Sequence, residues 1–166
     1  MQIQKHNFKK ISFKGNRTKQ YTTHQEKVMR DMKKAALQKG WLDIYTGEPF
    51  SRVNPPTIEH LISHSKKNAP EIILLRNTGF ELNGLDNIFP AGSLGNSLRS
   101  NQSMKKIVTA KPVVLTRLLD EIQNHYAGYK SELIDGKIWA EKLLNTLLMQ
   151  LNGICSDIKT RKIIIP

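Results

Sequence analysis

The sequence predicts an α+β protein in which helices surround a small sheet, and two kinds of pattern support this fold class. Apolar residues recur at helical spacing over residues 22–40 and again beyond residue 111. Between these segments, residues 57–62 and 87–90 have the short, extended character of strands. We therefore expect three parts along the chain: a basic arm and helix (1–40), a core (41–110) and a helical hairpin (111–166).

Positive charge is concentrated in the N-terminal quarter. The chain has 26 Lys and Arg against 14 Asp and Glu, a net charge of +12, and residues 1–40 alone carry +9 of it. Such a cluster is typical of proteins that bind a polyanion, so we expect nucleic acid as the partner, with a solubilising surface as the alternative. Residues 1–20 contain no acid and should form a mobile arm or a strand that orders on binding, and Thr23 with Glu26 should cap the helix that follows.

Cysteine content and hydropathy limit the class of protein. The single cysteine, Cys155, excludes an internal disulfide and leaves no Cys-x-x-Cys pair for a structural zinc. The first residues lack the apolar core of a signal peptide, and no apolar run approaches the roughly 18 residues of a membrane span. We therefore expect a cytoplasmic protein that binds no membrane.

The core should contain several extended elements. Residues 41–53 are expected to form a short hairpin that turns at Gly47, and residues 63–85 an inserted hairpin. Strand periodicity places Glu59 and His60 on opposite sides of residues 57–62, so they can serve one site only if the strand ends or bends there. Ser93 is expected to cap a helix that runs to about residue 105.

The C-terminal third is expected to form two helices. Pro112 suits a first helical turn, and apolar residues recur at helical spacing over residues 112–126 and 137–154. These apolar faces are too wide for an isolated helix pair, which leaves two alternatives. The hairpin packs on the core, or it provides the surface of a homodimer or of a complex with a partner protein.

Four residues of the core form a chemically suggestive set. Glu59 and His60 are adjacent, and Asn87 follows later in the chain, with Asn96 nine positions after it. A carboxylate and an amide oxygen suit a hard divalent cation, and an imidazole with an ordinary pKa of about 6.5 can accept a proton near neutral pH. Taken singly, each has an ordinary explanation, because Asn87 could be a turn residue and Asn96 a helix-start residue. Their joint spacing favours a site that combines a metal and a base.

The same residues, within TIEHLISHSK and LDNIFPAGSLGNSLRSN, resemble a known family. They are similar to the HNH endonucleases of the ββα-metal fold, including the HNH domains of RNA-guided CRISPR nucleases, over roughly residues 41–106. The resemblance implies that His60 is the general base, that Glu59 and Asn96 hold one Mg²⁺ (or Mn²⁺), and that Asn87 fixes the loop and the His60 ring. The implied activity is hydrolysis of phosphodiester bonds in DNA.

The chain departs from that family in its zinc sites. Many HNH proteins brace the fold with two Cys-x-x-Cys pairs, which would fall here around Asp43 and Thr46 and at Gly92 and Gly95. No structural zinc is therefore expected, and core packing should hold the site.

Basic side chains near the core and in the N-terminal quarter are candidate contacts to nucleic acid. The candidates are Arg17, Arg30, His64, Lys66, Lys67, Arg99, Lys105 and Lys106. Arg99 shares a helix face with Asn96, where its guanidinium would match a phosphate. His64 can equally be an exposed loop residue, and the lysines can be ordinary solvated charges.

Two other functions stay open. A non-catalytic nucleic-acid-binding or adaptor protein could keep an HNH-like core, although it would need neither a base nor metal ligands. An RNA-cleaving HNH nuclease is the other, because nothing in the sequence discriminates the 2′-hydroxyl. One set of site residues cuts one strand at a time, so double-strand cleavage would need a twofold dimer.

Overall fold

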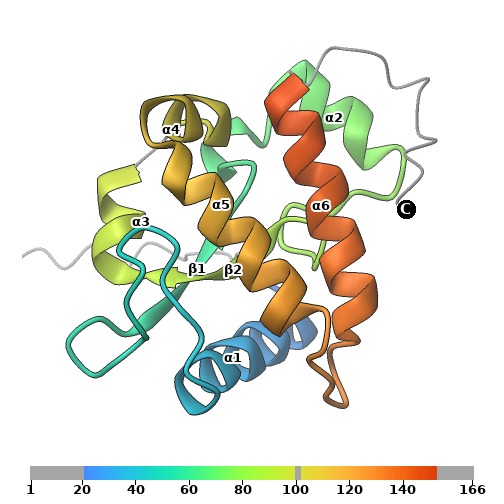
Figure 1. Ribbon diagram of the computed structural model, residues 1–166. Helices are drawn as coiled ribbons and strands as arrows, with labels where there is room; N and C mark the ends of the chain where they lie inside the picture. The colour runs from blue at the N-terminus through green and yellow to red at the C-terminus, as the bar shows by residue number, and fades with distance from the viewer. Residues whose placement is uncertain (1–20, 100–101, 153–166) are drawn as a thin grey trace, which may run out of the picture.

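The computed structural model describes residues 21–99 and 102–152, and this part has the expected α+β class. The chain passes through α1 (Thr23–Gln38), β1 (Pro56–His60), the 3₁₀ turn η1 (His64–Lys66), α2 (Pro70–Arg76), β2 (Ile88–Gly92), α3 (Ser93–Arg99), α4 (Met104–Ala110), α5 (Pro112–Glu121), the π-helical turn η2 (Ile122–Tyr126) and α6 (Gly136–Asn152). Helices surround a small antiparallel sheet made of β1 and β2 (Figure 1). The predicted arm, with Arg17, lies outside the described residues.

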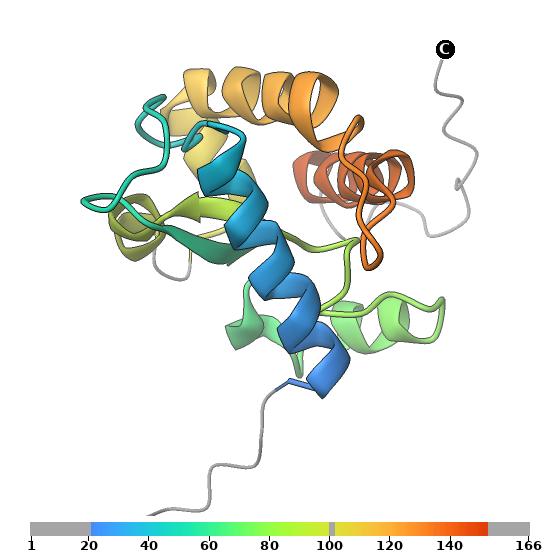
Figure 2. The same cartoon turned by 90° about the horizontal axis from the view of Figure 1, so that it is seen from below.

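Helix α1 crosses the sheet and begins one residue earlier than the sequence suggests (Figure 2). Thr22, not Thr23, is the cap residue: its side chain accepts from the Gln25 N–H, and the Gln25 side chain accepts from the Thr22 N–H. The reciprocal hydrogen bond comes from the residue three positions after the cap residue, so with Thr22 as the cap it is made by Gln25 and not by Glu26. The buried stripe is the expected one: Val28, Met29, Met32, Ala35 and Ala36.

The two strands pair in a register that places Glu59 opposite Phe89 and His60 opposite Ile88. Strand β1 ends at His60, two residues earlier than expected, and β2 leads directly into α3. The expected helix from Ser93 to about residue 105 is two helices, because Ser103 caps a new one by accepting from the Lys106 N–H.

The inserted hairpin predicted for residues 63–85 is wrong, because this segment contains η1 and α2 instead. The run EIILLR is apolar enough for either a strand or a helix, and Pro70 at the first helical position favours the helix. Helix α2 buries Ile72 and Leu75 in a small second core, whose other members are Ile62, Phe80 and Leu82. Residues 41–53 form a tight turn closed by an isolated bridge between Leu42 and Pro49.

The C-terminal helices pack on the core, which is the first of the two alternatives. Helix α6 runs back in the direction opposite to α5 (Figure 1), and their buried residues belong to the same main cluster as α1 and the sheet. Trp139 stacks on Tyr126, with ring centroids 4.4 Å apart, and its Nε1 donates to the Ile88 carbonyl at 3.0 Å. Val113 and Ile138 are the large apolar residues that these helices leave exposed within the described part.

Hydrogen bonds to Asp43 join the positions where the family resemblance places zinc-binding pairs. Asp43 is fully buried, and its Oδ1 accepts from the N–H groups of Tyr45 (3.2 Å) and Gly92 (3.0 Å). Its Oδ2 accepts from Thr46 Oγ1 (3.0 Å) and Asn54 Nδ2 (3.2 Å). A side chain at Gly92 would place its Cβ 2.4 Å from Asp43 Oδ2, so glycine is required for this close approach.

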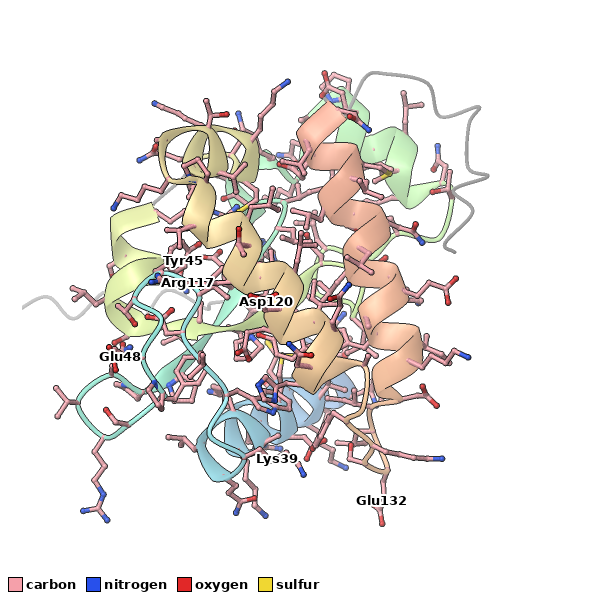
Figure 3. The ribbon with its side chains drawn as sticks, in the orientation of Figure 1. Lys39, Tyr45, Glu48, Arg117, Asp120 and Glu132 are labelled. Atoms are coloured by element: carbon pink, nitrogen blue, oxygen red, sulfur yellow. The ribbon has the colours of Figure 1, made fainter. Side chains whose placement is uncertain are left out.

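Arg117 of α5 holds the same turn from the other side (Figure 3). Its Nη1 donates to the Tyr45 carbonyl at 3.0 Å. Gly47 has a φ of +79°, and a Cβ there would lie 2.7 Å from the Arg117 guanidinium carbon. The C-terminal hairpin therefore helps to fix the turn that carries Asp43 and Tyr45.

Asp43→Ala should destabilise the protein by about 3 kcal/mol or more, because it leaves buried donors, above all the Gly92 N–H, without an acceptor. Urea unfolding followed by circular dichroism measures the change. Glu48→Ala removes an exposed acid from the same turn and is the matched control. Equal unfolding midpoints for the two variants would show that Asp43 does not brace the turn.

Glu121, at the end of α5, should make stability depend on pH. Its side chain is buried, and Oε2 accepts no hydrogen bond from any described residue. Burial raises the pKa of Glu121 to about 7; the Leu42 N–H opposes this shift and Asp120 adds to it. Folding therefore takes up a proton between the ordinary pKa of about 4.3 and pH 7, and stability falls as pH rises through that window.

The unfolding midpoint of the wild type should consequently drop between about pH 5 and pH 8, and Glu121→Gln should reduce that drop. Glu141→Gln, which changes an exposed acid on α6, should leave it unchanged. A Glu121→Gln protein with the full wild-type drop would contradict the assignment.

Candidate active site

The backbone that leaves β1 is held by two side chains from distant parts of the chain. Arg99 of α3 donates from Nη1 to the His60 carbonyl and from Nη2 to the Leu61 carbonyl (2.8 Å). Asn87 accepts from the Ile62 N–H at 2.7 Å and donates to the carbonyls of Ile62 (3.0 Å) and Leu82 (2.8 Å). Every polar atom of the Asn87 carboxamide is thus used to fix the loop after His60.

Glu59 lies on one side of β1 in a buried ion pair. Its Oε1 is 2.7 Å from Arg99 Nη1, and the two side chains are 8% and 1% exposed. Oε1 also accepts from the His60 N–H (2.7 Å), and Oε2 accepts a long hydrogen bond from the Tyr45 hydroxyl (3.4 Å). Burial raises the pKa of Glu59, and Arg99 is the largest of the groups that oppose this shift.

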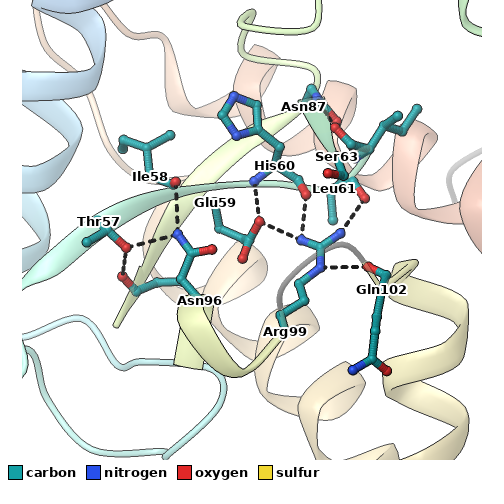
Figure 4. Close-up of polar contacts among 12 residues, drawn as sticks. Thr57, Ile58, Glu59, His60, Leu61, Ser63, Asn87, Asn96, Arg99 and Gln102 are labelled. Atoms are coloured by element: carbon teal, nitrogen blue, oxygen red, sulfur yellow. Dashed lines mark hydrogen bonds and ion pairs between the residues drawn. The ribbon is translucent and has the colours of Figure 1, made fainter. Parts of the chain in front are cut away.

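Arg99 does not have the geometry of a phosphate clamp. Its Nε donates to the Gln102 carbonyl at 3.2 Å, and its other nitrogens bind Glu59 and the carbonyls after β1 (Figure 4). The guanidinium is buried because α3 packs against the end of β1. The prediction that it contacts phosphate is corrected: in this structure it supports the site from inside.

Asn96 faces Glu59 from the first turns of α3. Its Nδ2 donates to Thr57 Oγ1 (3.1 Å) and to the Ile58 carbonyl (3.2 Å). These two hydrogen bonds turn the amide oxygen toward the Glu59 carboxylate (Figure 4). The structure therefore brings the two predicted oxygen ligands together on one side of β1.

His60 points to the other side of the strand, away from the Glu59 carboxylate (Figure 4). Its Nε2 lies 3.2 Å from Asn83 Oδ1, and the same oxygen is 2.6 Å from His64 Nε2. Burial lowers the pKa of His60 to about 4, the Asn83 contact opposes this, and His64 and Arg99 add to it. The ring is therefore neutral at physiological pH.

The remaining candidate contacts are found at the surface. Arg30, Lys66, Lys67, Lys105 and Lys106 are exposed, on α1, in and after η1, and on α4. His64 is partly exposed, and its ring contacts those of His60 and Tyr21.

Sequence reasoning missed two residues of the site. Tyr45 lies in the segment that was expected to form the short hairpin of residues 41–53, and its contact with Glu59 joins two positions 14 residues apart. Asn83 precedes Gly84, a pair typical of turns, and lies in the segment that was expected to be a hairpin. Neither position carries a signal that separates a site residue from a turn or core residue.

Comparisons with known proteins add nothing to this geometry: no family model, curated protein or solved structure matches the chain. Within the described residues, none of the helices has the length and apolar character needed to cross a membrane.

Arg99→Met should destabilise the protein by about 3–5 kcal/mol, because removing one partner of a buried ion pair leaves the other charge uncompensated. Urea unfolding measures this, with Arg52→Met, an exposed arginine, as the control. The double variant Arg99→Met with Glu59→Gln should lose less than the sum of the two single changes. Additive losses would show that the pair is not coupled.

Proposed function

We propose that the chain is a metal-dependent endonuclease of the HNH type that hydrolyses phosphodiester bonds in DNA. The observation that carries the proposal is the end of β1. There the Glu59 carboxylate faces the amide oxygen of Asn96, and the adjacent residue is a neutral imidazole. A strand pair followed directly by the helix with the second oxygen ligand is also the order that the HNH resemblance implies.

The two oxygens fit a hard divalent cation such as Mg²⁺ or Mn²⁺. Glu59 Oε2 receives the long Tyr45 hydrogen bond, and no described residue donates to Asn96 Oδ1. The described part holds no cluster of three or more His, Cys, Asp or Glu, so water and substrate phosphate would complete the shell. Mg²⁺ commonly keeps several waters and needs few protein ligands.

The cation would supply positive charge to the scissile phosphate and the leaving oxygen. His60 would take the proton of the attacking water. A pKa of about 4 makes the free ring a weak base, and an approaching phosphate would raise that pKa toward the working pH. Because His60 and Glu59 lie on opposite sides of β1, the phosphodiester would lie across the end of the strand.

Charge supports a nucleic acid as the substrate. The net charge is +12, and the lysines of η1 and α4 are exposed. Each phosphate that such side chains neutralise releases counterions, which gives affinity without sequence preference. DNA is the proposed substrate, and cleavage of labelled RNA in parallel distinguishes the RNA-cleaving alternative.

One observation favours the second candidate, a non-catalytic nucleic-acid-binding or adaptor protein. Arg99 lies against Glu59 Oε1 and offsets its charge, as expected for a carboxylate with a structural role. A nuclease would have to hold the cation on Oε2 and Asn96 while that ion pair persists.

Full-length protein with Mg²⁺ should convert supercoiled plasmid to open circles, and a chelator should stop the reaction. His60→Ala should lower the cleavage rate by about 10²–10⁴-fold, because it removes the proton acceptor, while DNA affinity stays nearly constant. Gel electrophoresis measures cleavage, and fluorescence anisotropy measures affinity. Linear DNA should form after the open circles. If the active form is a homodimer, the rate of linear DNA formation should rise steeply with protein concentration.

His24→Ala, at an exposed position on α1, is the matched control and should cut at the wild-type rate. Wild-type cleavage by His60→Ala would overturn the assignment of the base. Binding without Mg²⁺-dependent cleavage in any form of the protein would favour the adaptor.

A further inference from the structure

Asn83 places one oxygen between two imidazoles. Asn83 Oδ1 lies 3.2 Å from His60 Nε2 and 2.6 Å from His64 Nε2, and the two rings are nearly perpendicular, with centroids 5.2 Å apart. An amide oxygen has two lone pairs and only accepts hydrogen bonds. Both contacts therefore require a hydrogen on Nε2.

We propose that Asn83 is a positioning residue that holds neutral His60 as the Nε2–H tautomer, so that the Nδ1 lone pair becomes the proton acceptor. A neutral imidazole has one protonated nitrogen and one basic nitrogen, and the partner of the first decides which is which. The catalytic consequence rests on the proposed nuclease function, whereas the tautomer itself does not.

The loop that carries Asn83 is fixed from both sides. The preceding residue, Leu82, is buried in the second core, and its carbonyl accepts from Asn87 Nδ2 at 2.8 Å. After Asn83 the chain turns tightly: the Gly84 N–H donates to Glu81 (2.9 Å), and the Asn87 N–H donates to Gly84 (3.0 Å). A Cβ on Gly84 would lie 2.7 Å from Asp86 Oδ1, so the turn has no space for a larger residue.

The same Asn87 carboxamide binds Ile62, two residues after His60. One side chain thus fixes both the strand end that carries the imidazole and the loop that carries its acceptor. This shared support keeps the Asn83 oxygen opposite Nε2, because neither segment can shift without breaking hydrogen bonds to Asn87.

The amide orientation makes the proposal testable. If Nδ2 faced the rings instead, it would donate to both Nε2 atoms, and His60 would be the Nδ1–H tautomer. Asn83→Asp separates the two cases, since a carboxylate keeps the accepting oxygen and loses the donor. Asn83→Leu, of similar size, removes both.

The experiment is ¹⁵N NMR of the histidine side chains in the full-length protein, whose protonated and unprotonated ring nitrogens have well-separated shifts. The chain has five histidines, and the signals of His60 are assigned by their absence from a His60→Gln spectrum. The wild type and Asn83→Asp should show His60 protonated at Nε2, and Asn83→Leu should show a mixture of tautomers. Asn145→Leu, at an exposed position on α6, should match the wild type.

Cleavage assays on the same proteins complete the test. Asn83→Leu should lose at least about tenfold in rate, and Asn83→Asp should retain more activity than Asn83→Leu, because tautomer control is a large part of what an orienting residue contributes. Wild-type His60 protonated at Nδ1, or a tautomer that Asn83→Leu does not change, would overturn the proposal even if the protein cuts DNA. An Nε2–H tautomer that depends on Asn83 in a protein without nuclease activity would support the positioning and reject the nuclease.

Discussion

The buried ion pair between Arg99 and Glu59 is the interaction on which the candidate site depends. Strand β2 begins opposite His60, and beyond that pair the Leu61 N–H donates to the Asn87 carbonyl at 2.8 Å. The carbonyls of His60 and Leu61 obtain their donors from Arg99. Burying that guanidinium would be costly without an anion beside it, and Glu59 supplies the anion at 2.7 Å.

Asn87 connects the two sides of the strand. The ion pair and Asn96 lie on one side, and His60 with Asn83 lies on the other. The Asn87 carboxamide joins Ile62 to Leu82, which fixes the distance between the strand end and the Asn83 loop. A substitution in the Asn83 loop should therefore displace the His60 imidazole more than it displaces the Glu59 and Asn96 oxygens.

Local patterns predicted the features of the fold that depend on neighbouring residues. The stripe on α1, the start of α5 at Pro112 and the approximate strands follow from spacing and turn chemistry, and the structure has them. The prediction of a hairpin for residues 63–85 was wrong, because an apolar run alone fits a strand or a helix and only Pro70 favours the helix. The burial of Arg99 could not be predicted, because its partner Glu59 lies 40 positions earlier and only the packing of α3 brings them together.

Glu59 consequently has two roles in the proposal, and they cannot be separated by substituting Glu59 alone. Its loss would remove an oxygen ligand and also leave Arg99 buried without an anion, so inactivity could arise from either effect. Asn96 and His60 are more informative positions, because their side chains make no contact with Arg99 nitrogens among the described residues. The turn at Asp43 adds a further support: hydrogen bonds to Asp43 brace the sheet, and the same turn carries Tyr45, whose hydroxyl donates to Glu59 Oε2. Stability and the proposed chemistry are therefore coupled through the Glu59–Arg99 ion pair, in which Glu59 is also the proposed oxygen ligand and Arg99 holds the backbone after β1.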